Sequence, residues 1–147
     1  MSHSFPEDAA EMLQSYIDSS DGFLSRMGAE VVKLTRDRTR VRLEYSEDVA
    51  NATQKGWLHG GAIATLVDSA GGLALRPYLD NPVRDGVATV SMNVDYLDAA
   101  TDDVVAEAEV LRAGGTVGFS RVEVIQEEDR DRVAAGRGAY RLFTNED

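Results

Sequence analysis

The chain contains no cysteine and very little histidine. Without cysteine it can form neither a disulfide framework nor a Cys-ligated zinc site, and it has no thiolate nucleophile. His3 and His59 are its two histidines, too few for a histidine-rich metal site. We therefore expect the protein to work without a bound metal and without a cofactor.

Long apolar segments and basic side chains are also scarce. No apolar run approaches the roughly 20 residues that a membrane-spanning helix needs. Residues 1–8 have neither the basic nor the apolar region of a signal peptide. The 15 Lys and Arg residues are outnumbered by 26 Asp and Glu residues, which gives a net charge of −11. Nucleic acids and anionic membranes would repel such a surface, so we expect the protein to bind neither. The lack of a membrane span and of a signal peptide predicts a soluble, cytoplasmic protein.

The basic residues are themselves skewed, because Lys33 and Lys55 are the two lysines and the rest are arginine. A carboxylate-rich, lysine-poor surface is typical of proteins from a salt-rich cytoplasm, where salt screens the self-repulsion of the surface. An ordinary acidic protein from an organism with arginine-rich codons is the alternative interpretation.

Hydrophobic periodicity predicts a helix and two strands before the central segment, and four strands after it. The length of 147 residues fits a single domain over 1–147. In residues 7–19, Ala10, Leu13 and Ile17 have helical spacing, which predicts a short amphipathic helix. Alternating patterns predict strands over residues 29–34, 40–45, 89–96, 104–111, 116–126 and 132–143. Residues 127–131 form a charged hairpin between the last two.

The central segment, from residue 60 to about Pro77, has apolar residues around nearly the whole helical circumference. This pattern is typical of a buried helix, and Pro77 would end it. Small residues at 70–72 would let another backbone come close. The sum is an α+β fold, in which one curved antiparallel sheet of five to six strands wraps a long central helix. The outer face of such a sheet meets either water or a second subunit.

Two features of this helix are candidates for chemistry. Gly60 and Gly61, after His59, would let a ligand approach the free N–H groups of a helix start, as an oxyanion hole requires. The alternative is a loop that needs glycine for its backbone conformation. Asp68 lies within the apolar helix, where a carboxylate beside a cleft would be a general base or a nucleophile. The alternative is a carboxylate satisfied by an arginine or by backbone donors.

Residues 56–68, with the sequence GWLHGGAIATLVD, resemble the hotdog-fold acyl-CoA thioesterases of the phenylacetyl-CoA (PaaI-like) type. In that family a G-x-x-H-G-G segment precedes the central helix, and a catalytic acidic residue follows seven positions after the second glycine. The similarity continues through residues 87–100, 112–116 and 132–138 and covers about residues 27–143. It implies the hotdog fold, an acyl-CoA substrate with an aryl or medium-chain acyl group, and a homodimer or homotetramer.

The resemblance also implies roles for individual residues. Asp68 would activate or orient the attacking water, Thr89 would help to hold that water, and the N–H of Gly60 would polarise the thioester carbonyl. His59 is either catalytic or, as we favour, a structural residue that pins the loop by a hydrogen bond. No serine lies in a nucleophile-elbow context, so water is the expected nucleophile.

The substrate contacts are less closely specified. The second oxyanion donor is open among Asn51, Thr53 and Gln54, because the asparagine common in the family falls on Thr53. Positions matching those used by relatives to hold the CoA phosphates are Arg112, beside the Gly114 turn, and Arg137; both are alternatively solvated surface residues. Trp57 would line the acyl pocket or belong to the core, and the helix and the strand of Val90 and Met92 would form its walls. A non-catalytic acyl-CoA-binding or regulatory hotdog protein is the rival function.

Helix geometry adds one expectation about assembly. Gly60 and Asp68 are eight residues apart, which separates them by roughly 12 Å along a helix axis. A thioester carbonyl and its attacking water must be about 3 Å apart. One chain cannot supply both groups to one substrate, whereas an isologous dimer with antiparallel central helices can. We therefore expect active sites shared between subunits.

Overall fold

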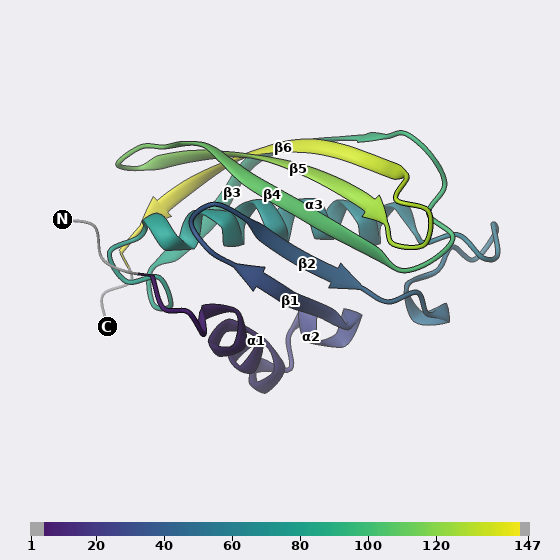
Figure 1. The fold of residues 1–147 in the computed structure, drawn as a ribbon, viewed down its shortest axis with the longest axis horizontal. Helices are drawn as coiled ribbons and strands as arrows, with labels where there is room; N and C mark the ends of the chain where they lie inside the picture. Colours follow the sequence, from purple (N-terminus) through teal and green to yellow (C-terminus); the bar gives the residue numbers. More distant parts are fainter. Residues whose placement is uncertain (1–4, 145–147) are drawn as a thin grey trace.

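The computed structural model describes residues 5–144, which form three α-helices, two short 3₁₀ helices and six β-strands (Figure 1). In chain order these elements are α1 (Ala9–Ser20), α2 (Phe23–Met27), β1 (Ala29–Leu34), β2 (Thr39–Leu43), η1 (Glu47–Val49), α3 (Gly60–Leu75), η2 (Arg76–Tyr78), β3 (Gly86–Tyr96), β4 (Val104–Ala113), β5 (Val117–Gln126) and β6 (Arg132–Phe143). His3 lies outside the described residues. The expected number of strands and the long central helix are confirmed.

The strands form one antiparallel sheet in the order β1-β2-β4-β5-β6-β3. Helix α3 runs along one face of the curved sheet, and α1 and α2 lie beside β1 (Figure 1). Irregular register occurs in several pairs, including β3 with β6 between Thr89 and Ser91. Such bulges bend and twist strands, so they favour a sheet curved around the helix.

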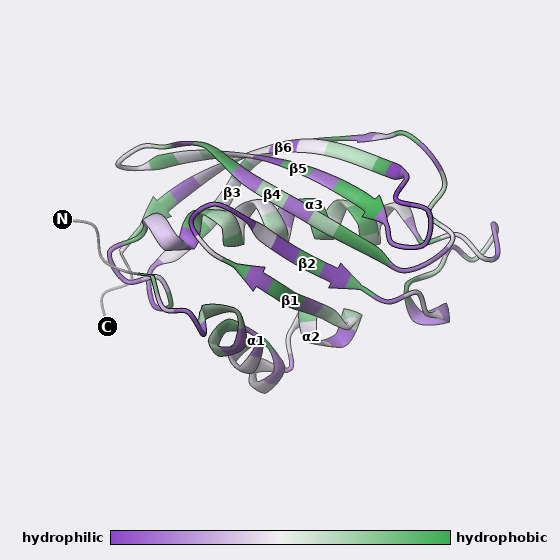
Figure 2. Ribbon diagram, in the orientation of Figure 1, coloured by the Kyte–Doolittle hydropathy of each residue, from purple (hydrophilic) through white to green (hydrophobic). Residues whose placement is uncertain are grey.

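Alternation along the strands separates the two faces of the sheet. On β5, Val122 and Val124 are buried against α3, while Arg121 and Glu123, which alternate with them, point outward. Figure 2 shows the same alternation of hydrophilic and hydrophobic residues along β1 and β2. Several ion pairs lie on the outer face: Arg40 with Glu107 at 3.3 Å, Arg132 with Glu123 at 3.4 Å and Arg121 with Glu109 join neighbouring strands, and Arg42 of β2 pairs with Asp103 and Glu127 just outside β4 and β5. This part of the outer face is therefore suited to water.

The central helix differs from the expected fully buried one. Leu66, Val67 and Ala70 are completely buried against the sheet. The opposite side of α3 carries a stripe of small or polar residues that are half-buried or exposed in the chain: Gly61, Ala64, Thr65, Asp68 and Gly72. We call these five residues the open stripe of α3. Within a single chain the expectation of burial on all sides was wrong, because the apolar residues on this stripe are small and the sheet covers the helix from one side.

Strand β3 forms one edge of the sheet and pairs with β6. Its apolar side chains are unusually accessible, since Val90 is 65% and Met92 is 40% exposed. The other edge strand, β1, is short and packs against α1. An exposed strand edge with apolar side chains is a surface that a second chain can cover.

The observed helix bounds differ from the expected ones by small shifts. The N-terminal helix runs over Ala9–Ser20 rather than residues 7–19, and α3 gives way at Leu75 to the η2 turn, which contains Pro77. The short elements α2 and η1 were not expected. Within residues 5–144, no helix combines the length and hydrophobicity needed to cross a membrane.

Candidate active site

The start of α3 leaves one backbone donor available. His59 is the N-cap residue, with extended backbone angles (φ −63°, ψ 136°), and its Nδ1 accepts a hydrogen bond of 2.8 Å from the N–H of Gly61. The N–H groups of Ala62 and Ile63 donate to the His59 carbonyl. The N–H of Gly60 has no hydrogen-bond partner among the residues that the structure describes. It is therefore the donor at this helix start that a ligand could use.

Gly60 opens into a cavity of about 300 Å³ whose lining includes Asn51, Trp57 and Tyr96. The Tyr96 hydroxyl donates to the Gly60 carbonyl at 2.7 Å, which fixes the first turn of α3. Half-exposed Trp57 and Tyr96 give the cavity an aromatic rim. Tyr96 was not among the expected site residues, although it lies within the strand motif that carries the family resemblance.

The structure separates the three candidates for the second oxyanion donor. Asn51 lines the cavity of Gly60, whereas Thr53 and Gln54 do not. Asn51 Oδ1 accepts hydrogen bonds from the N–H and the hydroxyl of Thr53 and from the N–H of Gln54. These bonds fix the orientation of the Asn51 amide and leave its Nδ2 group free to donate. The loop thus brings Asn51, rather than Thr53 or Gln54, to the cavity of Gly60.

Asp68 faces β3 from the open stripe of α3. Thr89 Oγ1 donates to Asp68 Oδ1 at 2.6 Å, a short charge-assisted hydrogen bond between helix and edge strand. In the described chain, Asp68 Oδ2 makes no hydrogen bond. Both residues line a second cavity of about 210 Å³. A half-buried carboxylate with one oxygen oriented and the other accessible can accept a proton from a bound water.

Tyr140 of β6 holds the backbone of Asp68 in place. Its side chain is almost completely buried, at 1% exposure, and its hydroxyl donates to the backbone carbonyl of Asp68 at 3.0 Å. Burial, together with the charge of Asp68, raises the pKa of the Tyr140 phenol, so the hydroxyl stays a donor. This contact could not be predicted from a local sequence pattern, because Tyr140 lies 72 residues from Asp68.

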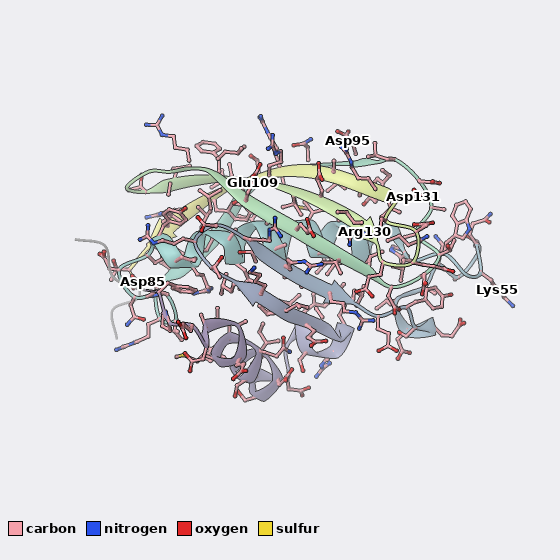
Figure 3. All side chains as sticks on the ribbon, viewed as in Figure 1. Lys55, Asp85, Asp95, Glu109, Arg130 and Asp131 are labelled. Carbon is pink, nitrogen blue, oxygen red and sulfur yellow. The ribbon has the colours of Figure 1, made fainter. Side chains whose placement is uncertain are left out.

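Within one chain, the two halves of the expected site do not meet. Gly60 lines one cavity and Asp68 the other, eight residues further along α3. Lys55, in the loop before α3, and Asp85, in the loop after it, lie at opposite ends of the molecule (Figure 3).

Neither cavity is lined by the expected phosphate-binding residues: Arg112 and Arg137 are exposed on β4 and β6, and Gly114 lies in the β4–β5 turn.

Comparisons with known proteins identify the family. A sequence profile of the thioesterase superfamily matches residues 55–133. A candidate esterase of Halobacterium salinarum is 41% identical over 146 residues, which cover 95% of this chain and 96% of that protein. Human acyl-coenzyme A thioesterase 13 is 35% identical over 102 residues, 68% of this chain and 69% of that one. The crystal structure of zebrafish thioesterase superfamily member 2 has a TM-score of 0.80 at 26% identity and covers 95% of this chain and 99% of that one.

The fold is therefore the hotdog fold, and the sequence similarity identifies a class of thioester hydrolases. This chain belongs to the thioesterase superfamily.

Proposed function

We propose that the protein hydrolyses the thioester of aryl- or medium-chain acyl-CoA to the free acid and CoA in the cytoplasm. The observation that carries the proposal is the Asp68–Thr89 pair at the wall of a cavity, with an oriented carboxylate on the exposed side of the central helix. The name of the human relative, an acyl-coenzyme A thioesterase, supports the choice of CoA esters.

In the proposed reaction a water molecule lies against Asp68 Oδ2 and the Thr89 hydroxyl. Asp68 accepts a proton as the water oxygen attacks the thioester carbonyl carbon. The tetrahedral intermediate then collapses, the C–S bond breaks, and the sulfur leaves as the CoA thiol after it receives the proton. The other product is the carboxylic acid. Thr89 acts as a positioning group, because its own proton is engaged by Asp68 Oδ1.

The developing negative charge on the carbonyl oxygen would be stabilised at the start of α3. The free N–H of Gly60 is the first donor and Asn51 Nδ2 the second, because both open into the same cavity. Preorganised donors of this kind contribute about 2.7–4 kcal/mol each to transition-state stabilisation. His59 would have a structural role here, since its Nδ1 caps the helix and keeps the Gly61 N–H away from the carbonyl oxygen.

We further propose that each active site combines Asp68 of one subunit with Gly60 of another, in a homodimer or a dimer of dimers. The roughly 12 Å between the two groups along one helix requires this. The small residues on the open stripe of α3 would let a second antiparallel helix approach, and the exposed edge of β3 would extend the contact. The ion-paired outer face of β2, β4 and β5 is the less suitable surface.

A thiol-release assay over a panel of aryl and alkyl acyl-CoA esters tests the activity. We expect release of free CoA from at least one class of ester, and loss of most of that release in Asp68→Asn. If the wild-type protein binds acyl-CoA without releasing thiol, it is an acyl-CoA-binding or regulatory hotdog protein and the proposal fails. Release that survives Asp68→Asn unchanged would instead place the chemistry elsewhere.

A further inference from the structure

Two side-chain hydroxyl groups reach from the sheet to the backbone of α3. Ser120 Oγ of β5 donates to the Gly71 carbonyl at 2.8 Å, and the Tyr140 hydroxyl of β6 donates to the Asp68 carbonyl at 3.0 Å. Both side chains are buried, Ser120 completely. Strands β5 and β6 lie over α3 (Figure 1), so these bonds cross the core between the sheet and the helix that carries Asp68.

Glycines make room for these hydroxyl groups. A Cβ on Gly71 of α3 or on Gly138 of β6 would overlap the Tyr140 hydroxyl. Gly138 is also the residue that pairs with Ser120 in the register of the sheet, so the same missing side chain lies beside both donors. Part of the small-residue segment 70–72 is thus used to admit a hydroxyl group from the sheet.

Neither carbonyl needs a second donor for its own sake. In an α-helix each carbonyl accepts from the N–H four residues further on, so the N–H groups of residues 72 and 75 serve the Asp68 and Gly71 carbonyls. A hydroxyl group in an apolar core costs desolvation free energy, which its hydrogen bond then offsets. Stability alone therefore gives little reason for the two hydroxyl groups.

The two bonds fix how α3 is turned about its axis. The Asp68 and Gly71 carbonyls are three residues apart, which is about 4.5 Å along the axis and about 60° around it. Two attachments on the same side of a helix oppose both rolling and sliding over the sheet. Side chains end about 5–6 Å from a helix axis, so a roll of about 10° would move the Asp68 carboxylate by about 1 Å. The hydrogen bond of 2.6 Å from Thr89 to Asp68 depends on that position.

We infer that Ser120 and Tyr140 are positioning residues for the catalytic carboxylate, because their hydroxyl groups hold α3 at the rotation that aims Asp68 at Thr89. This inference rests on the proposed function, in which Asp68 accepts the proton of the attacking water. A displacement of about 1 Å can cost about 100-fold in rate. Loss of the two bonds should therefore lower kcat and leave KM nearly unchanged, since the substrate contacts away from Asp68 are kept.

The kinetic test removes the hydroxyl groups and keeps the hydrocarbon shape of the side chains. Ser120→Ala and Tyr140→Phe should each lower kcat for thiol release by about 3- to 10-fold, and the double variant by roughly 10- to 100-fold. Thr39→Val is the matched control, because the Thr39 hydroxyl is buried on β2 and has no hydrogen-bond partner within residues 5–144. This control should keep the wild-type kcat.

A second measurement does not depend on hydrolysis. The NMR chemical shift of the Asp68 carboxyl carbon at neutral pH reports the hydrogen bonds of the carboxylate, and Asp68→Asn assigns the resonance by its loss. The double variant should move this resonance toward its position in Thr89→Ala, whereas Thr39→Val should not move it. A wild-type protein that releases no thiol would contradict the proposed hydrolysis, and the resonance would still decide the positioning role.

Urea unfolding checks that each variant is folded, and the transitions should stay close to that of the wild-type protein because both carbonyls keep their helical donors. If Tyr140→Phe does not fold, Ser120→Ala decides alone, since it deletes a single buried oxygen. A folded double variant in which the Asp68 resonance or kcat stays at its wild-type value overturns the inference. An equal loss of kcat in Thr39→Val also overturns it, because the loss would then follow from removing any core hydroxyl.

Discussion

The hydrogen bond from Thr89 to Asp68 joins an edge strand to the central helix and leaves one carboxylate oxygen accessible. Asp68→Asn keeps the shape of the side chain but removes the proton acceptor. We expect kcat to fall by about 10²- to 10⁴-fold, the usual contribution of a general base. Binding of a non-hydrolysable acyl-CoA analogue should change little. A variant that keeps near wild-type kcat would remove Asp68 from the mechanism.

Thr89→Ala tests positioning rather than proton transfer. The change deletes the donor to Asp68 Oδ1 but leaves the carboxylate in place. We expect kcat to fall by roughly 10- to 100-fold at most, less than in Asp68→Asn, since one charge-assisted hydrogen bond is lost. Thr89→Ser keeps the hydroxyl and should stay close to the wild-type rate. An effect as large as that of Asp68→Asn would mean that Thr89 itself takes part in proton transfer.

Residues of the site differ in how far the sequence could predict them. Asp68 and Gly60 stand out because a carboxylate in an apolar helix and paired glycines at its start are rare patterns that chemistry explains. Asn51 could not be chosen over Thr53, because the choice depends on the turn of an irregular loop. Tyr140 acts through a contact with a segment 72 residues away, and no local pattern distinguishes it from an ordinary core residue.

At the scale of elements, two adjacent glycines show how α3 fits the sheet. A Cβ on Gly71 would overlap the Tyr140 hydroxyl, whereas one on Gly72 would meet Tyr140 and Val87 at ordinary distances of 3.5 and 3.7 Å. We expect Gly71→Ala to lower the free energy of unfolding by about 1–3 kcal/mol. Gly72→Ala, the matched control, should raise it by roughly 0.5–1 kcal/mol through helix propensity.

Urea unfolding of both variants measures the difference. If Gly71→Ala is as stable as the wild-type protein, Tyr140 does not pack rigidly between α3 and β6. The hydrogen bond from Tyr140 to the Asp68 carbonyl would then be too mobile to help hold the carboxylate in place.

The elements themselves were largely predictable, because each long strand alternates and α3 has a long apolar run with a proline beyond its end. The short helix α2 has too few residues to show a period. The order of strands was not predictable either, since β3 pairs with β6 across 35 intervening residues, and no hairpin signal joins them. The open stripe of α3 was missed because alanine and glycine count as apolar whether they are buried or exposed.

At the scale of the whole molecule, a net charge of −11 remains after every lysine and arginine is counted, including those in the ion pairs of the outer face. Salt weakens those pairs, which contribute about 0–1 kcal/mol each, but it also screens repulsion over the whole surface. If the composition reflects adaptation to salt, Tm should rise markedly between low salt and about 2 M KCl, where the screening length is only a few ångströms. A flat or falling Tm would favour the ordinary acidic protein.

A shared active site requires that two subunits associate, and mixing two inactive variants can test whether they do. Asp68→Asn removes the base, and Gly60→Pro removes the N–H donor. Proline is tolerated at the first position of a helix, and the extended angles of His59 suit a residue before proline. A Cβ on Gly60 would be 3.5 Å from Tyr96, so the ring has room. Each variant alone should be nearly inactive and should show an unfolding transition like that of the wild-type protein.

In a mixed dimer, one site collects both substitutions and the other collects neither, if each site takes Asp68 from one subunit and Gly60 from its partner. Random exchange of equal amounts gives half heterodimers, so about a quarter of the wild-type thiol release should return. Differently tagged chains, purified through both tags, would confirm that heterodimers form and should then recover about half. Heterodimers without activity would mean that one chain supplies both groups, which the roughly 12 Å along α3 makes geometrically difficult. The recovery of activity therefore decides whether the isolated chain, with its two separate cavities, holds two halves of different active sites.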